Sequence, residues 1–311
     1  MAYNARIRKY LVAFLITGWA VTLLFYAAPK KKLYTDNRVL MGTFWEVKSP
    51  DKAAGRIVFE EASRIEGLLS KYLADSEISV LNRKGKSKVS PDTFYVIKKA
   101  KEFWQETDGA FDITIAPLIR LWGFADKKYT VPKNSQIKAA LKLVGSDKII
   151  LHEKDNVVEF SNQGTEIDLG AIAKGFALDC AVNKLKKAGI NNCLINAGGQ
   201  VYALGSRFGK PWKIAIKNAQ ENRQSNILEL SSRSASTSGD YEQFFFKEGR
   251  RYIHIINPKT GLPVDSGTSS VTVVDKSALV ADALSTAFFI LEAEGRKNLE
   301  AKFPKTQFYL N

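Results

Sequence analysis

The chain contains few of the residues that build disulfide-stapled or cysteine-ligated metal proteins. Its 311 residues include two cysteines, Cys180 and Cys193, and two histidines. Two cysteines make neither a disulfide framework nor a metal cluster, so both are expected to be small, buried apolar side chains. Internal repeats and low-complexity linkers are also absent. With 45% hydrophobic and 25% charged residues, the sequence has the balance of an ordinary globular protein.

The sequence also lacks a long basic run outside its N-terminus. The formal net charge is +14, and residues 1–32 contribute six of these charges without any acidic residue. The other eight are spread over the remaining chain. A nucleic-acid-binding surface gathers its basic residues on one face or in one stretch, so nucleic acid is not expected as a partner.

An apolar segment lies between two basic clusters near the N-terminus. It runs from Tyr10 to Ala28, 19 residues without a charge. At about 1.5 Å per residue, a helix of this length spans roughly 28 Å, close to the thickness of a bilayer core. The pattern also fits a cleavable signal, although the small-residue cleavage site is weak and Pro29 follows it. We favour an uncleaved membrane anchor in residues 1–32, followed by a single domain in residues 33–311.

Hydrophobic periodicity predicts strands and helices without regular alternation, which indicates an α/β or α+β fold. Strands are expected within residues 39–47, 148–160 (two strands), 192–205, 211–219, 244–258 (a hairpin turning at 248–249) and 269–275. Helices are expected over about 53–82, 91–109, 134–144, from the glycine-rich turn at 170–175 to about 187, and over 277–293. The serine-rich stretch 234–240 is expected to be a loop able to approach a ligand.

The stretch "EIDLGAIAKGF", residues 166–176, resembles a phosphate cradle but matches neither common nucleotide signature. A triphosphatase loop requires a serine or threonine after its lysine, and none follows Lys174. The glycine pattern of dinucleotide-binding folds is missing as well. Gly170, Gly175 and the start of the following helix nevertheless favour an anion site, with Lys174 adding a full charge. The alternative is a lysine on a solvated helix face.

Two further stretches carry candidate chemistry. In "ADALSTA", Asp282 and Thr286 are four residues apart and share a helix face, a hard-oxygen pair that suits magnesium. The alternative is a buried aspartate held by helix N-termini or an arginine. In "YIHIINPKTGLPV", His254 precedes a turn and is a candidate general base, unless it is an ordinary strand histidine. His152 lacks such a context and is expected at the surface.

Eight stretches in the same order resemble the ApbE-type FAD:protein FMN transferases. They are "MGTFWEV", "SKYLADSEISVLN", "DGAFDITIAPLIRLWGF", "EIDLGAIAKGFALD", "NAGGQVYALG", "STSGDYEQFF", "HIINPKTGLPV" and "VADALSTAFFIL", spanning Met41 to Leu291. The resemblance implies magnesium-dependent cleavage of FAD, attachment of FMN through a phosphoester to a threonine or serine of an acceptor protein, and release of AMP. It implies an acceptor among respiratory electron-transfer subunits. It also implies a place in the bacterial cell envelope, here anchored in the inner membrane with the catalytic domain on the periplasmic side.

The resemblance carries functional residues over position by position. Matches to the FAD pocket are Met41, Tyr72, Ala110, Phe111, Asp112, Asp168, Lys174 and Ile256. Matches to the magnesium site, which manganese also suits, are Ala171 through its carbonyl, Asp282, Ser285 through its backbone and Thr286. His254 matches the base that deprotonates the acceptor hydroxyl, and Lys174 adds catalytic positive charge.

The sequence departs from the family pattern at two places. Asn257 stands where an aspartate is common, so any second carboxylate there is in doubt, and the lipid-attachment cysteine is replaced by the apolar segment. Two alternatives to the transferase stay open. One is an FAD pyrophosphatase that uses water as the acceptor and releases free FMN and AMP. The other is a membrane-tethered flavin carrier without catalysis.

Overall fold

The computed structural model describes residues 32–216, 227–265 and 267–311. Residues from Tyr34 to Asn311 form one compact unit. The segment Tyr10–Ala28, predicted to be an anchor or a signal, lies outside the described residues. Within the described part, no helix is both long enough and apolar enough to cross a membrane.

A seven-stranded sheet forms the centre of this unit. Its strand order is β1-β2-β6-β7-β10-β13-β14, and every neighbouring pair is antiparallel. The strands are β1 (Tyr34–Leu40), β2 (Thr43–Ser49), β6 (Cys193–Ala197), β7 (Gln200–Leu204), β10 (Arg233–Gly239), β13 (Ser270–Asp275) and β14 (Gln307–Leu310). The wholly antiparallel sheet assigns the fold to the α+β alternative of the prediction.

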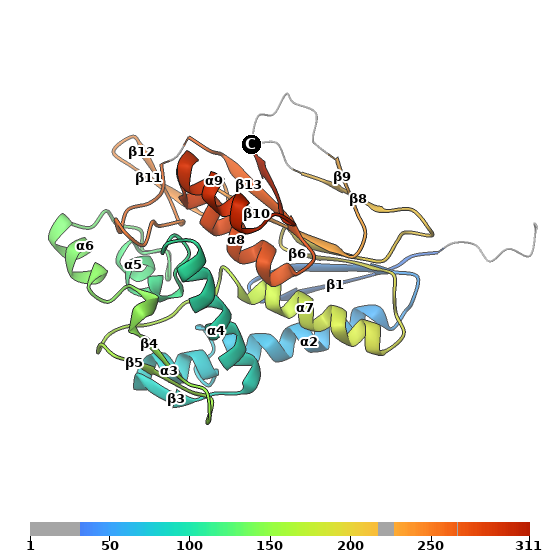
Figure 1. Cartoon of the computed structure of the whole chain (residues 1–311), viewed down its shortest axis with the longest axis horizontal. Coiled ribbons are helices and arrows are strands. Elements are labelled where there is room, and N and C mark those ends of the chain that lie inside the picture. Colours follow the sequence, from blue (N-terminus) through green and yellow to red (C-terminus); the bar gives the residue numbers. More distant parts are fainter. Residues whose placement is uncertain (1–31, 217–226, 266) are drawn as a thin grey trace, which may run out of the picture. The chain divides into compact units, whose positions relative to one another are not determined.

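Three helices pack on this sheet and on one another: α2 (Ala54–Leu69), α7 (Ala173–Lys187) and α8 (Ala278–Ile290) (Figure 1). In β2 the residues Trp45, Val47 and Ser49 are buried while those between them are more exposed, as expected for a strand with one covered face. Helix α8 is apolar around most of its circumference because it lies over β10 and β13 and also contacts α7. The main hydrophobic core fills the space between these helices and the sheet.

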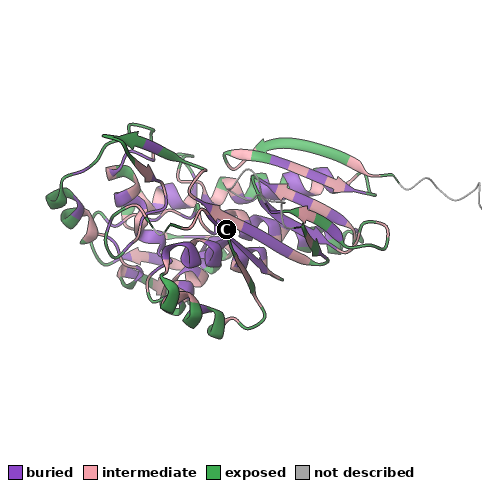
Figure 2. Ribbon diagram, turned by 90° about the horizontal axis from the view of Figure 1, so that it is seen from above, coloured by how far each residue is buried: buried purple, intermediate pink, exposed green. Residues whose placement is uncertain are grey.

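The remaining described elements lie outside the seven-stranded sheet and the three helices that cover it. The helices among them are α3 (Glu77–Lys84), α4 (Pro91–Glu106), η1 (Ile113–Ile115), α5 (Ala116–Leu121), α6 (Asn134–Leu141), η2 (Ser146–Lys148) and α9 (Ala293–Lys302). A three-stranded sheet has the order β3 (Lys86–Lys88), β5 (Val157–Phe160), β4 (Ile149–His152). Two strand pairs complete the set: β8 (Trp212–Ala215) with β9 (Ile227–Leu230), and β11 (Phe244–Lys247) with β12 (Arg250–Ile253). A second hydrophobic cluster joins α5 and α6 to the β11–β12 hairpin through Trp122, Phe124 and Phe245. Figure 2 shows this hairpin and α6 as largely exposed, at the left of the view.

Several local predictions are confirmed. Ser90 caps α4 by accepting the backbone N–H of Thr93, and the hairpin turns at Glu248 and Gly249, both with positive φ. The strands β4 and β5 meet at the predicted turn, and His152 lies at the surface, paired with Glu159. Both cysteines are free, but Cys193 alone is fully buried and Cys180 is half-buried.

Four local predictions are wrong for identifiable reasons. Stretch 39–47 is two strands, because Met41 and Gly42 both have positive φ and form a two-residue turn; stretch 192–205 is likewise two strands, β6 and β7, around Gly198 and Gly199. The helix expected over 53–82 breaks between α2 and α3, where the side chain of Ser76 caps a new helix start. The serine-rich stretch is not a loop: β10 pairs with β7 and β13 inside the sheet, and its buried Ser234 donates to the carbonyl of Val201.

Candidate active site

One cavity of about 320 Å³ opens where the two hydrophobic clusters meet. Its volume lies within the range of about 300–1,000 Å³ that is usual for small-molecule sites. Eleven of the thirteen predicted site residues line it: Tyr72, Ala110, Phe111, Asp112, Asp168, Ala171, Lys174, His254, Ile256, Asp282 and Thr286. The fold therefore gathers into one space residues that are up to 214 positions apart, from Tyr72 to Thr286.

The close packing of α7 on α8 sets the centre of the cavity. A Cβ atom at Gly175 would lie 2.4 Å from the carbonyl oxygen of Ala278, so only glycine permits this approach. Asp179, one turn further along α7, accepts hydrogen bonds from the backbone N–H groups of Ala278 and Leu279 and from Ser277 Oγ, at 2.8, 3.1 and 2.6 Å. It thereby caps α8 and fixes the register between the two helices.

Asp282 of α8 faces the start of α7. Its Oδ2 accepts the backbone N–H of Gly175 at 2.9 Å, and its Oδ1 lies 3.4 Å from Ser236 Oγ. Burial raises the pKa of Asp282, and Lys174 partly offsets this. Thr286 lies one turn further on the same helix face and also lines the cavity, as its spacing predicted. The sequence left open that Asp282 is simply a buried aspartate held by a helix N-terminus. That holds for Oδ2, which accepts the N–H of Gly175, whereas the hydrogen bond that Oδ1 accepts among the described residues is the long one from Ser236.

Lys174 and a second lysine provide the positive charge of the cavity. Lys174 lies in the first turn of α7, and its Nζ is 3.4 Å from the carbonyl oxygen of Gly170. Lys71 forms a largely buried ion pair with Asp168, with 2.6 Å between Nζ and Oδ2. Burial opposes the charge of Lys71, but the Asp168 carboxylate outweighs it and raises the lysine pKa. Asp168 Oδ1 also accepts the N–H of Gly170 at 2.9 Å, which shapes the glycine turn.

His254 presents one ring nitrogen to the cavity. Its Nδ1 lies 3.2 Å from the carbonyl oxygen of Gln243, which can only accept a hydrogen bond, so Nδ1 carries the proton and Nε2 is left as the acceptor. Nε2 lies 3.9 Å from the carboxylate of Glu242. Burial lowers the pKa of His254 below 6.5, so the imidazole is neutral at pH 7. This state is the one that a general base requires.

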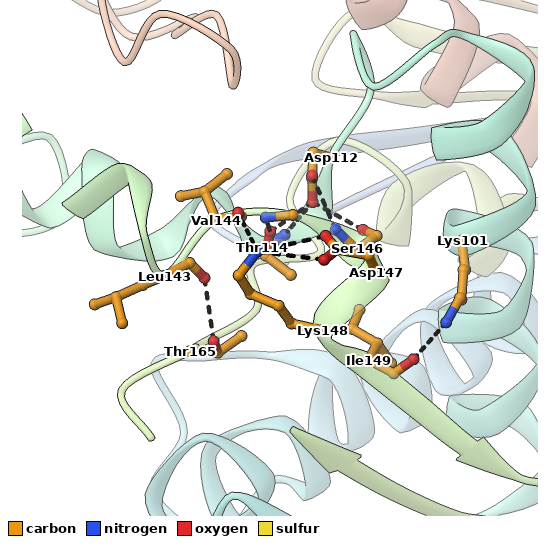
Figure 3. Close-up of polar contacts among 11 residues, drawn as sticks. Lys101, Asp112, Thr114, Leu143, Val144, Ser146, Asp147, Lys148, Ile149 and Thr165 are labelled. Carbon is orange, nitrogen blue, oxygen red and sulfur yellow. Dashed lines mark hydrogen bonds and ion pairs between the residues drawn. The ribbon is translucent and has the colours of Figure 1, made fainter. Parts of the chain in front are cut away.

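Asp112 lines the cavity, but its side chain is engaged elsewhere (Figure 3). Its Oδ1 accepts hydrogen bonds from the backbone and hydroxyl of Thr114 and from Ser146 Oγ, at 2.8, 2.6 and 2.8 Å, and Oδ2 accepts Ser146 N–H at 3.1 Å. Burial still raises the pKa of Asp112. The carboxylate joins η1 to η2, so it shapes the wall on which Ala110 and Phe111 lie.

Two predicted site residues lie outside the cavity lining. Met41 is in the β1–β2 turn with φ 50°, and its N–H donates to Glu66 Oε1 at 2.9 Å. Ser285 is fully buried beneath the lining, where its Oγ bonds Ser238 Oγ at 2.9 Å and the carbonyl oxygen of Asp282 at 2.9 Å. Ser285 thus supports the helix turn that carries the metal candidates.

Sequence reasoning missed several residues that line the cavity. They include Lys71, Gln200, Ser236, Ser238, Glu242 and Gln243. Lys71 is next to the predicted Tyr72, and the hydroxyl residues belong to the serine-rich stretch, so a signal existed for these. Gln200 and Glu242 lie in two of the stretches that resemble the family, "NAGGQVYALG" and "STSGDYEQFF", but no chemistry was assigned to them, because only the tertiary fold brings them to the cavity.

The charges of the cavity indicate what it can bind. Four carboxylates and two lysines line it, a formal excess of two negative charges when His254 is neutral. Within the described residues no cluster of three or more histidine, cysteine, aspartate or glutamate side chains could hold a metal by itself. A hard cation held by Asp282, hydroxyl and carbonyl oxygens, and a phosphate-bearing ligand fits this donor set, because magnesium is usually bound by one or two carboxylates together with substrate phosphates. The fold and the cavity are thus those of an α+β protein with a small-molecule site whose donor set fits a phosphorylated ligand.

Comparison with known proteins agrees with this class. Residues 41–310 match the model of the ApbE family. The FAD:protein FMN transferase of Vibrio cholerae is 34% identical over 269 residues, with 82% of this chain and 80% of the relative covered; that of Klebsiella pneumoniae is 34% identical over 270 residues, covering 85% and 84%. The crystal structure of the ApbE protein of Thermotoga maritima superposes with a TM-score of 0.83 at 32% identity, covering 90% of this chain and 94% of that one. The flavinyl transferase ApbE of Pseudomonas stutzeri gives 0.80 at 29% identity, with 90% of each chain covered.

The chain belongs to the ApbE family. The predicted family and the mixed fold are both confirmed by these matches. The roles of the individual site residues stay predictions, and the cavity shows which of these residues lie together.

Proposed function

We propose that this chain is an FAD:protein FMN transferase. It cleaves the pyrophosphate of FAD and attaches FMN to a threonine or serine hydroxyl of an acceptor protein, releasing AMP. The observation that carries this proposal is that Lys174, Asp282 and His254 line one cavity, so an anion-binding group, a metal-binding carboxylate and a neutral base address the same ligand. The relatives named FAD:protein FMN transferase support it.

In this proposal the residues of the cavity divide the work. Lys174 and the N–H groups at the start of α7 provide fixed positive potential for the pyrophosphate. His254 Nε2 removes the proton from the acceptor hydroxyl as its oxygen attacks the phosphorus of the FMN half. The new bond joins that oxygen to phosphorus, the bond to the bridging oxygen breaks, and AMP leaves with its electron pair. Phe111, Ile256 and Tyr72 offer apolar and aromatic surface for the rings of FAD.

A divalent cation, magnesium or manganese, completes the proposed site. Asp282, the hydroxyl of Thr286 and the carbonyls of Ala171 and Ser285 would hold it, although Ser285 lies behind the lining. When bound, such an ion neutralises charge on the pyrophosphate and on the departing AMP. The excess of carboxylates in the cavity supports its presence.

We further propose where the protein works and on what. The apolar segment Tyr10–Ala28 would tether it to the inner membrane with its catalytic domain on the periplasmic side, and the acceptor would be a respiratory electron-transfer subunit. The positive charges on both sides of the segment and the absence of a lipid-attachment cysteine support an apolar tether. Fractionation of cells into membrane and periplasm would test this location directly.

The experiment that tests the function is chromatography of the nucleotides formed from FAD. The protein from Leu33 onward is mixed with FAD, magnesium and the soluble domain of a flavin-carrying subunit of a sodium-pumping respiratory complex. If the protein is a transferase, AMP should form without an equal amount of free FMN, and a chelator should suppress both AMP release and FMN attachment to the acceptor. Equal AMP and free FMN would identify a pyrophosphatase. FAD binding without any AMP would identify a carrier.

A further inference from the structure

The strand β11 has an edge that no described residue pairs with. β11 and β12 form a two-stranded sheet on their own, in which Gln243 pairs with His254 through a hydrogen bond from His254 N–H at 3.0 Å. Hydrogen-bonded and non-bonded pairs alternate along an antiparallel ladder, so the pairs that contain Phe244 and Phe246 are non-bonded. The N–H and C=O groups of these two residues therefore point away from β12.

The side chains of β11 alternate between a face packed against the protein and a face exposed to solvent. Phe245 is buried and stacks on Tyr129 and Tyr252, with ring centroids 5.0 and 5.1 Å apart, which fixes the hairpin to the second hydrophobic cluster. Phe244 and Phe246 lie on the other face, 5.7 Å apart edge to face, and are 38% and 66% exposed. Exposed aromatic side chains beside an unpaired strand edge are typical of a binding surface.

This edge leads directly into the cavity. Glu242 and Gln243, which precede β11, both line the cavity, and Gln243 lies opposite His254 in the hairpin register. A chain that pairs with the free edge of β11 and extends past Gln243 would lie beside the part of the cavity lining that contains His254. Figure 1 shows the hairpin at the same end of the molecule as α5, whose Ile119 also lines the cavity.

The hairpin also carries net positive charge. Residues 244–253 contain Lys247, Arg250 and Arg251 against the single acid Glu248. Arg251 is engaged with Asp240 at 3.0 Å, whereas Arg250 has only an exposed contact with Asp265 at 3.5 Å. Lys247 has no acidic partner among the described residues. Asp240 and Glu242, just before the hairpin, offset two of these charges, so the edge offers one positive side chain without an acidic partner in the described part of the chain, Lys247, to an acidic side chain of an extended segment.

We propose that an extended segment of the acceptor protein, with an acidic side chain that reaches Lys247, adds to β11 as a third strand and so delivers its threonine or serine hydroxyl to His254. This inference rests on the proposed function, because a pyrophosphatase needs no protein acceptor. Main-chain hydrogen bonds would supply the affinity, and contacts with Phe244 and Phe246 the selectivity for alternating apolar side chains.

Proline scanning of β11 tests the backbone part of the proposal. Phe246→Pro removes the outward N–H while the bonded pairs on either side remain; Phe246→Ala removes the same ring and keeps the N–H. The probe is the soluble domain used above, and the rate of FMN transfer is measured against its concentration. Strand addition predicts a KM for the acceptor about three- to tenfold higher in Phe246→Pro than in Phe246→Ala, with an unchanged Kd for FAD from flavin fluorescence.

Two controls separate pairing from damage to the hairpin. Lys247→Pro removes an N–H that faces β12, so it should lower the melting temperature, whereas Phe246→Pro should not. Phe44→Ala removes another exposed aromatic ring, on β2 and outside the cavity, and should leave the KM for the acceptor unchanged. Equal KM values for Phe246→Pro and Phe246→Ala would overturn strand addition while leaving the transferase intact. No FMN transfer by the wild type would refute the proposed function, and the docking edge with it.

Discussion

The backbone N–H of Gly175 donates to the carboxylate of Asp282 across the contact of α7 with α8, at 2.9 Å. This bond couples the two motifs that the sequence offered separately, the glycine-rich turn and the acidic helix. Asp179 holds the same contact from the other side by capping α8. The position of the metal candidate therefore depends on how closely the helices approach, and Gly175 sets that distance.

Replacing Gly175 should separate the helices. In Gly175→Ala the new Cβ would meet the backbone of Ala278 and Leu279 at 2.4–2.7 Å, so the free energy of unfolding should fall by about 1–3 kcal/mol. Urea denaturation measures this change. Gly67→Ala in α2 is the matched control, because nothing lies within 4 Å of its Cβ position, and alanine there should be neutral or stabilising by about 0.5–1 kcal/mol. Equal effects of the two substitutions would refute the close-contact argument.

Asp282 should be required for the metal but not for the metal-free fold. Burial raises its pKa, so its contribution to stability is present at low pH and is lost as the pH rises through the raised value. Asp282→Asn removes that cost, so at pH 7 the metal-free variant should melt no lower than the wild type. It should also lose at least about 100-fold in turnover.

Magnesium titration during thermal melting checks the same assignment. The melting temperature of the wild type should rise with magnesium, and that of Asp282→Asn should not. Thr286→Ser, which keeps the hydroxyl, should behave as the wild type, whereas Thr286→Val should lose part of the shift. A normal magnesium response in Asp282→Asn would remove this residue from the metal site.

The pH dependence of transfer should report His254. Because burial lowers its pKa below 6.5, the imidazole is neutral at pH 7 and takes up a proton only at lower pH, so kcat/KM for the acceptor should fall on the acid side of pH 6.5. His254→Gln should lower kcat about 10²- to 10⁴-fold and abolish this limb. A variant with an unchanged acid limb would show that another group is the base.

The ion pair between Lys71 and Asp168 should hold the anion end of the cavity. Lys71→Met leaves Asp168 without its partner beside the ligand, so the affinity for FAD should fall about tenfold. Lys71→Arg keeps the charge and should lose much less. Quenching of flavin fluorescence gives both affinities, and wild-type affinity in Lys71→Met would place the pair outside the binding site.

Local sequence predicted the parts of the site better than their relations. Lys174, Asp282 and His254 each belong to a short motif whose residue types are enough to predict its chemistry. The structure brings the three residues to one cavity. Glu242 was missed because only the hairpin fold places it 3.9 Å from His254.

The strand β10 shows why part of the fold escaped prediction. Serine and threonine normally favour turns, and the stretch 234–240 carries the signals of a loop. In the structure these small hydroxyl residues find partners inside the sheet, as when Thr237 bonds Thr272 at 2.8 Å. Asp112 is the converse case. Its motif predicts a residue of the FAD pocket, and it lines the cavity, but the sequence did not show that its carboxylate also accepts hydrogen bonds from Thr114 and Ser146.

The most direct test of the central claim is intact-mass spectrometry of the acceptor after incubation with the protein, FAD and magnesium. The account predicts a mass gain of one FMN less one water on the acceptor, on a threonine or serine, in amounts equal to the AMP released. The gain should be absent with Asp282→Asn or a chelator. An acceptor of unchanged mass in the presence of released AMP and free FMN would contradict the account.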